Sequence, residues 1–207
     1  FCNAGFIFFD NNLPYKMVGD VLFNINTIAL IIIGGFGYIA AFDIWSYRKA
    51  RRFADLKLHT KLMLIGTILL IALGAIIFLS VEWANPKTFG SLPMWDKVLA
   101  AIFQSVTPRT AGIATVDYSQ LHPITLFVSI ILMFIGAGPN STGGGVKIST
   151  VMVAILASCT LFNNRSDVEV FGRRIPMVTV FKANGIIFLS ILLVLLATCY
   201  LAWDEPF

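Results

Sequence analysis

The residues with the most informative chemistry lie at 105–117, Ser-Val-Thr-Pro-Arg-Thr-Ala-Gly-Ile-Ala-Thr-Val-Asp. They follow an apolar segment, residues 95–104, that is too short to cross a bilayer. Irregular backbone lies at membrane depth only where it lines a water-filled path or is buried in protein. A Thr-x-Gly turn below a half-length helix can direct carbonyl oxygens at a dehydrated cation. The sequence therefore predicts a re-entrant loop that passes a monovalent cation.

A turn near the start of the chain has a similar pattern. The first turn (residues 3–5) and the second turn (residues 110–112) both end in Ala-Gly followed by a bulky apolar residue. Glycine allows backbone angles at which successive carbonyl groups point the same way. We therefore expect both turns to supply the ion-binding oxygens of a selectivity filter, and two ordinary surface turns are the alternative. The expected filter residues are Asn3, Ala4, Gly5, Thr110, Ala111 and Gly112.

Two charged residues flank the second turn. If this segment is re-entrant, Arg109 lies inside the membrane. A charge there costs on the order of 2.5–3.5 kcal/mol on insertion scales and needs a partner. The carbonyl end of the 95–104 helix is adjacent and carries a partial negative charge. We expect Arg109 to support the filter from behind rather than to contact the ion. Asp117 is expected at the outer mouth, where it either concentrates cations or is a solvated loop acid.

A Gly-rich loop, residues 136–147, interrupts a later apolar run. Pro139 and three consecutive glycines break a helix strongly, and small polar residues suit a flexible constriction in a wet cavity. A phosphate-binding loop is excluded because Val146 separates Gly145 from Lys147. We interpret the loop as a gate beneath the filter, and a rigid kink is the alternative. The expected gate residues are Gly136, Gly138, Ser141, Thr142, Gly143, Gly144, Gly145 and Lys147, the last with an ammonium that could reach the pore or a carboxylate.

The composition requires a membrane. The 207 residues are 57% hydrophobic and 13% charged, well outside the range of soluble domains. Two charge-free runs, residues 62–81 and 183–203, can each cross about 30 Å of hydrocarbon as a helix. Two more apolar stretches, residues 21–45 and 121–162, contain glycines and polar residues. Because four such runs exclude a soluble fold of this size, we expect an all-α, multi-pass protein of the cell membrane.

Positive charge gathers in two short loops, residues 47–61 and 165–182. Such loops stay cytoplasmic, so residues 82–117 are expected to face outside. The net charge of +4 does not indicate nucleic acid, because ten of the fifteen basic residues lie in these two loops. The same order of segments follows each of the two turns: an apolar run broken by glycines, then a basic loop, then a charge-free span. This order indicates an internal repeat. We therefore expect an internal fragment of a longer protein with boundaries at residues 1–57, 58–162 and 163–207.

Several stretches together resemble the Trk/Ktr/HKT potassium transporters. Residues 1–6, 103–112, 133–137 and 141–145 carry the general likeness, and residues 59–62 and 171–176 are similar to the bacterial Ktr membrane subunit in particular. The resemblance implies a potassium-channel-like fold of four helix–pore-loop–helix units around one filter. Residues 1–57 would hold the filter turn and inner helix of the second unit, residues 58–162 the complete third unit with the gate, and residues 163–207 a cytoplasmic loop and the outer helix of the fourth.

The same resemblance implies potassium uptake, with sodium as a possible coupling ion and no cofactor bound by this chain. It implies a membrane homodimer gated by a cytoplasmic nucleotide-binding ring of the RCK type, which would touch residues 48–57 and 165–174. This sequence departs from the family pattern at Ile113 and Ala114, which replace a usual Phe and Asn beyond the second turn. Asn140 replaces a usual Gly in the Gly-rich loop.

Other functions stay open at this point. A secondary transporter of an organic solute would use the broken helix as a midplane binding site. A non-conducting assembly subunit is another possibility. An enzyme would need a converging acid–base or metal set, and the sequence shows none, so enzymatic activity is not expected.

Overall fold

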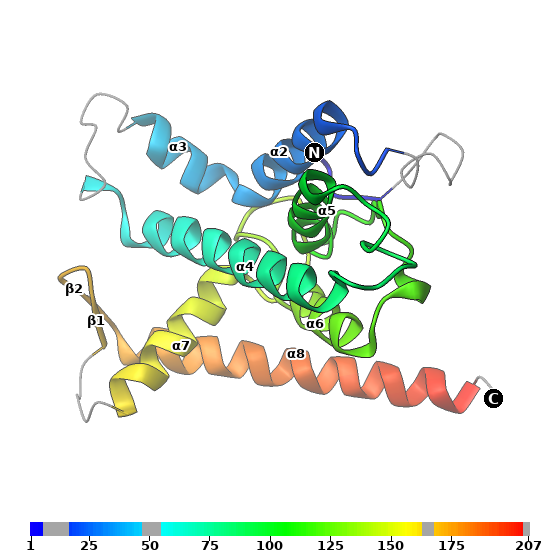
Figure 1. The fold of residues 1–207 in the computed structure, drawn as a ribbon. Coiled ribbons are helices and arrows are strands. Elements are labelled where there is room, and N and C mark those ends of the chain that lie inside the picture. Colours follow the sequence, from blue (N-terminus) through cyan, green and yellow to red (C-terminus); the bar gives the residue numbers. More distant parts are fainter. Residues whose placement is uncertain (6–16, 47–54, 163–167, 205–207) are drawn as a thin grey trace. The chain divides into compact units, whose positions relative to one another are not determined.

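The computed structural model describes residues 1–5, 17–46, 55–162 and 168–204. The chain forms two compact units, Phe1–Ile148 and Ser149–Phe207. The described residues of the first unit form five α-helices and a short 3-10 helix (Figure 1). These elements are α2 (Val21–Phe36), α3 (Tyr38–Ser46), α4 (Leu58–Glu82), α5 (Met94–Val106), η3 (Tyr118–Gln120) and α6 (Pro123–Phe134).

The second unit contains most of α7 (Ile148–Phe162) and all of α8 (Met177–Asp204), with a small antiparallel hairpin between them. Strand β1 (Val168–Val170) pairs with β2 (Arg173–Ile175), and the buried Val168 and Ile175 lie opposite each other. Phe171 and Gly172 join the strands with φ angles of 53° and 70°, the positive values that a two-residue type I′ turn requires. The sequence analysis expected only a basic loop here, so the hairpin is an addition to an otherwise all-α fold.

Two described helices are long and apolar enough to cross a membrane: α4 and α8 have mean hydropathies of 2.9 and 2.6 over their most apolar windows. They cover the two charge-free runs and confirm them as helices. Helices α2 and α3 make a third candidate span if they are taken together, although they are bent by 93°. Helices α6 and α7 are apolar but shorter. The predicted all-α, multi-pass membrane class is confirmed.

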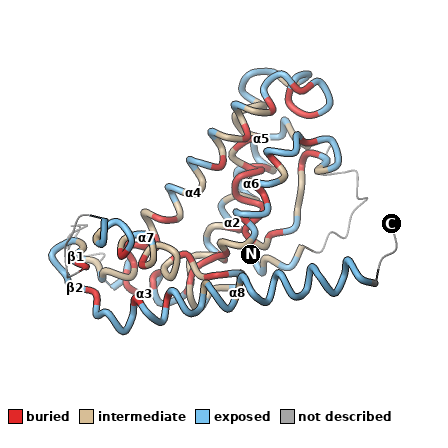
Figure 2. The backbone as a smooth tube through the Cα atoms, turned by 90° about the horizontal axis from the view of Figure 1, so that it is seen from below, coloured by how far each residue is buried: buried red, intermediate tan, exposed pale blue. Residues whose placement is uncertain are grey.

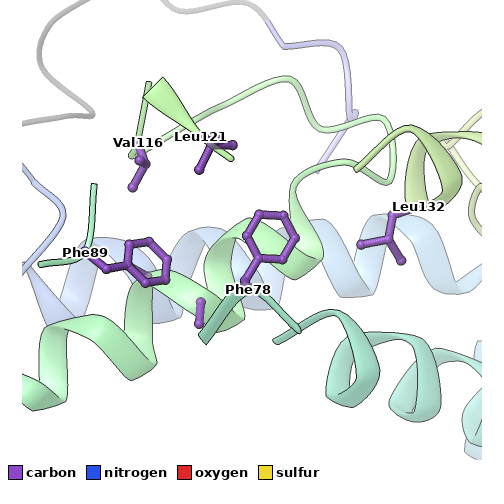
Figure 3. Packing of buried hydrophobic residues seen from close by; sticks show 7 residues of the cluster. Phe78, Phe89, Val116, Leu121 and Leu132 are labelled. Atoms are coloured by element: carbon purple, nitrogen blue, oxygen red, sulfur yellow. The ribbon is translucent and has the colours of Figure 1, made fainter. Parts of the chain in front are cut away.

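Helix α4 is the centre of the first unit and contacts α3, α5 and α6 (Figure 1). A buried cluster joins Phe78 of α4 and Leu132 of α6 to Phe89, Val116 and Leu121 from the connecting segments (Figure 3). The C-terminal half of α5 is mostly buried (Figure 2). Ala100 and Ala101 belong to this cluster, and Val106 packs in a second cluster with Ile31 and Ala111. The structure thereby fixes the short helix that precedes the second turn.

The crossing of α4 and α5 depends on one small residue in each helix. A Cβ on Gly74 would overlap the Ser105 hydroxyl, which donates a hydrogen bond of 2.8 Å to the Ile71 carbonyl. Close approach at small residues and interhelical hydrogen bonds are the main means of helix association in lipid. Gly74 and Ser105 therefore position α5 along α4.

A buried carboxylate fixes each end of α4. At its start, the Asp43 side chain of α3 accepts hydrogen bonds from the Lys57 amide at 3.1 Å and from the Thr60 hydroxyl at 2.5 Å. Lys57, the N-cap residue, has no capping side-chain bond of its own. Asp43 therefore caps α4 from a neighbouring helix, satisfying an amide that the first turn of a helix leaves without a partner.

At the other end of α4, the Glu82 carboxylate is completely buried. One oxygen accepts from the Asn85 amide and the Thr88 hydroxyl, both at 2.7 Å. The other accepts from the His122 backbone amide at 2.8 Å and the Thr125 hydroxyl at 2.6 Å. Four donors stabilise the anion and tie the end of α4 to the first turn of α6, where the helix dipole also favours negative charge.

Candidate ion pathway

The second turn is held in shape by the residues just before it. Helix α5 ends at Val106, and the next residue, Thr107, donates its side-chain hydroxyl to the Ile113 carbonyl. The Thr107 carbonyl accepts the Ala111 amide at 3.1 Å. Thr107, Arg109 and Ala111 are buried, whereas Gly112 is exposed. A single threonine therefore closes the turn from both ends and leaves Gly112 at the surface.

The first and second turns have the same backbone pattern. Asn3 and Gly5 have φ angles of 51° and 69°, and Thr110 and Gly112 have φ angles of 67° and 78°. The alanine between each pair has no positive φ. A positive φ is uncommon for residues other than glycine and most costly for β-branched ones such as Thr110. The similarity of the two turns in sequence thus extends to their conformation.

The two turns are in contact at their glycines. A Cβ added to Gly112 would lie 2.8 Å from the Gly5 Cα, and one added to Gly5 would lie 3.2 Å from the Ala111 carbonyl oxygen. Residues of both turns line two hollows, of about 460 Å³ and about 390 Å³. All six predicted filter residues are therefore brought together beside open space, and a side chain on either glycine would push the turns apart.

Arg109 lies behind the second turn, 6% exposed. Its Nε and Nη2 atoms have no hydrogen-bond partner among the described residues, and neither has the side-chain amide of Asn3. Both side chains line one cavity of about 10 Å³ with Gly35 and Thr67, enough room for a single water molecule. The structure therefore places Arg109 next to the first turn as well as the second, which the sequence analysis did not foresee.

Asp117 is exposed and lies at the start of η3. The Ser119 backbone amide and the Ser119 hydroxyl donate to its carboxylate at 2.9 and 2.8 Å. These two hydrogen bonds, the backbone one first, lower the pKa of Asp117 from its ordinary value. Asp117 is therefore ionised at neutral pH, and its carboxylate also caps a short helix.

The Gly-rich loop separates α6 from α7 and is closed at its base. The Gly136 amide donates to the Val146 carbonyl at 2.9 Å, and the Val146 amide donates to the Phe134 carbonyl at 3.0 Å. A Cβ on Gly136 would overlap the Gly144 carbonyl. The Lys147 ammonium donates to the Gly143 carbonyl at 2.6 Å. Within the part of the chain that the structure describes, Lys147 thus binds the loop itself rather than a carboxylate, and the loop forms one closed lobe.

The lobe packs on the break between α2 and α3. The Gly34 carbonyl accepts the Thr142 amide at 3.2 Å, and the Gly35 carbonyl accepts the Gly138 amide at 2.8 Å. In return, the Tyr38 amide donates to the Asn140 carbonyl at 3.3 Å. The loop therefore supplies partners that the ends of two helices would otherwise lack. The sequence analysis noted only that this apolar stretch contains glycines and did not predict the contact.

The lobe also contacts the second turn and the segment that leads into the first turn. The Thr142 hydroxyl lies 3.0 Å from the Phe1 carbonyl oxygen, just before the first turn. A Cβ on Gly143 would lie 3.0 Å from the Thr110 hydroxyl oxygen of the second turn. The predicted gate residues thus form a single structure directly beside the predicted filter residues.

The cation transport protein family TrkH matches residues 1–204. The chain belongs to this family. Among its relatives, the Ktr system potassium uptake protein B of Vibrio alginolyticus is 41% identical over 92% of this chain and 41% of its own length. The protein of the same name from Bacillus subtilis is 38% identical over 99% of this chain and 45% of its own length.

The potassium/sodium uptake protein NtpJ of Enterococcus hirae is 34% identical over 99% of this chain and 44% of its own length. This TrkH family chain thus spans less than half the length of the curated relatives it matches. Its fold is similar to that of the potassium transporter TrkH from Vibrio parahaemolyticus, with a TM-score of 0.73 at 20% identity over 97% of this chain and 42% of that one. The family and the apolar helices place the protein in the bacterial cell membrane as a multi-pass protein.

Proposed function

We propose that the protein takes up potassium across the bacterial cell membrane as the ion-translocating subunit of a Trk/Ktr-type system. The observation that carries this proposal is the contact of Gly5 with Gly112 between two turns of the same unusual conformation. Backbone carbonyl groups of such turns replace the water around a dehydrated cation. Residues 1–57, 58–162 and 163–207 are then parts of the second, third and fourth pore units.

Selectivity requires that the carbonyl oxygens keep their positions when the ion changes. The Thr107 bond to the Ile113 carbonyl and the buried end of α5 hold the second turn. The carbonyl end of α5 points its partial negative charge at the same turn, which favours a cation there. Arg109 fills the space behind the turns as a support. Asp117, ionised at neutral pH, adds negative charge near the mouth.

The Gly-rich loop controls passage below the filter in this proposal. Its base is held by two backbone hydrogen bonds and its tip by Lys147 and the α2–α3 break. A few bonds of this kind can exchange for water at small net cost, since each contributes only about 0.5–1.5 kcal/mol. The loop can therefore move without unfolding the helices on either side of it.

The relatives also suggest what accompanies the transport. One relative is named as a potassium/sodium uptake protein, and two are named as components of a Ktr system. We propose that sodium is the coupling ion, that the full-length subunit is a homodimer, and that an RCK-type ring docks on the basic cytoplasmic segments. Residues 48–54 and 165–167 of these segments lie outside the described residues.

The test is ion uptake by the full-length protein in cells that lack their own potassium systems. The wild type is expected to rescue growth at low potassium and to take up potassium in preference to sodium. Gly112→Ser is expected to lower this preference about tenfold or more, because a Cβ would meet the Gly5 Cα at 2.8 Å and the φ of 78° is unfavourable for serine.

The matched control is Gly185→Ser in α8, where a Cβ meets no described atom within 4 Å. This variant is expected to keep the wild-type preference. Failure of the wild type to rescue growth, or equal uptake of the two ions by the wild type, would contradict the proposed function. An unchanged preference in Gly112→Ser would show that the turn does not coordinate the ion.

A further inference from the structure

The Thr142 side chain contacts two backbone carbonyl groups that lie outside the Gly-rich loop. Its hydroxyl oxygen lies 3.0 Å from the Phe1 carbonyl oxygen and 3.0 Å from the Gly34 carbonyl oxygen. Phe1 lies two residues before the first turn, and Gly34 lies in the last turn of α2. A single side chain thus connects the loop, the segment that leads into the first turn, and a helix end.

The hydrogen-bond count indicates which carbonyl needs the hydroxyl. The Gly34 carbonyl already accepts the Thr142 backbone amide at 3.2 Å. Among the described residues, the Thr142 hydroxyl is the one donor found for the Phe1 carbonyl. A hydroxyl has a single proton and can satisfy one of these acceptors at a time. The Phe1 carbonyl is therefore the acceptor that loses most if the hydroxyl is removed.

The position of the Phe1 carbonyl is also restricted from the other side. A Cβ on Gly34 would overlap the Phe1 carbonyl oxygen. The oxygen thus lies between a bare backbone on α2 and the Thr142 hydroxyl, with no space to shift toward the helix. Movement of Thr142 away from this position would release the segment that leads directly into Asn3 and Gly5.

We propose that Thr142 is a positioning residue that couples the Gly-rich loop to the first turn. When the loop moves, Phe1 loses its hydrogen bond and the carbonyl oxygens of residues 3–5 become less well ordered. Passage and ion preference are then linked through one hydroxyl group, so the state of the loop changes how well the turn distinguishes potassium from sodium. This inference rests on the proposed function of the turns and the loop.

The test compares Thr142→Val with Thr142→Ser in the full-length protein reconstituted into liposomes, with potassium and sodium fluxes measured separately. Valine keeps the shape of threonine without the hydroxyl, whereas serine keeps the hydroxyl. Thr142→Val is expected to lower the potassium-to-sodium flux ratio about fivefold, the effect of losing one ordinary hydrogen bond. Thr142→Ser is expected to retain the wild-type ratio.

Ser141→Ala is the matched control within the loop. The Ser141 hydroxyl donates to the Gly138 carbonyl and accepts the Gly143 amide, so its bonds stay inside the lobe. This variant is expected to change the flux rate and to leave the flux ratio unchanged. A residue that acts only on the loop would behave in the same way, so the ratio separates the coupling role from a purely structural one.

Gly34→Ala tests the same link without replacing Thr142. The added methyl group would overlap the Phe1 carbonyl oxygen and lie 3.1 Å from the Thr142 hydroxyl oxygen, so it disturbs their contact, and alanine is otherwise favourable in a helix. It is expected to lower the flux ratio as Thr142→Val does. A wild type that discriminates, together with unchanged ratios in both variants, would overturn the coupling. A wild type that transports no potassium would instead overturn the proposed function.

Discussion

The α2–α3 and α6–α7 segments are each an interrupted apolar helix, but the two interruptions differ in length and in how their backbone groups are hydrogen-bonded. Between α2 and α3 the break is a single residue, Gly37, with a φ of 80° and a bend of 93°. Between α6 and α7 the break is a closed lobe that contains residues 136–147. The short break leaves carbonyl groups without partners in their own helix, and the long break supplies the amides that bind them. In a membrane, an interrupted helix is stable only if another segment satisfies its backbone.

The largest effect on potassium uptake is expected from adding a side chain at Gly37, the break between α2 and α3. In Gly37→Ala a Cβ would overlap the Pro139 carbonyl, and the φ of 80° costs an alanine roughly 1–2 kcal/mol in addition. The bend and the lobe cannot both keep their positions, so potassium uptake by the full-length protein is expected to be lost. Uptake and the amount of protein in the membrane are measured together.

Gly35→Ala is the control for this change, since its Cβ would meet its nearest described neighbour, the Ala137 Cβ, at 3.3 Å. It is expected to retain much of the wild-type uptake. If both variants transport equally well, the fit between the short break and the lobe does not matter for function.

A moderate effect on potassium flux is expected from removing a hydrogen bond that closes the lobe between α6 and α7. Lys147→Met removes the charged hydrogen bond of 2.6 Å to the Gly143 carbonyl and keeps the length of the side chain. The lobe is then less well closed, and potassium flux is expected to rise several-fold with the ion preference retained. Flux into liposomes measures this directly. A fall in flux would instead assign the ammonium a role in conduction.

The smallest effect is expected at Asn140, which has a φ of 55° in the lobe. Asparagine tolerates this conformation better than most residues, and glycine adopts it freely. Asn140→Gly keeps the backbone carbonyl that accepts the Tyr38 amide, so a change in flux of no more than about twofold is expected. Asn140→Ala lacks this tolerance and is expected to reduce flux further. Loss of uptake in Asn140→Gly would reveal a function of the amide side chain.

The helices and both turns could be predicted because their signals are local. Residues 62–81 need only length and a lack of charge to become α4, and Ala-Gly at 4–5 and 111–112 needs only glycine to adopt a positive φ. The bounds of α4 exceed this run because Asp43 caps its start and the Glu82 site holds its end. Contacts between helix ends leave no periodic pattern in the sequence.

The contacts around the Gly-rich loop could not be predicted for a related reason. Thr142 and Phe1 are 141 positions apart, and the acceptor is a backbone carbonyl that every residue has. Arg109 could be recognised as a buried charge, but its closeness to Asn3 depends on how two turns meet in space. The β1–β2 hairpin left only a weak signal. Val168 and Val170 precede Phe-Gly, but Ile175 is the one β-branched residue of the second strand, and its two arginines made the segment look like part of a basic loop.

The Glu82 site has a consequence for how the protein is made. Its four donors come from residues 85, 88, 122 and 125, on both sides of α5 and the second turn. A buried carboxylate is costly until such donors are in place. During synthesis, the end of α4 can therefore reach its final state only after the ribosome has added Thr125, by which time α5 and the second turn have already been made.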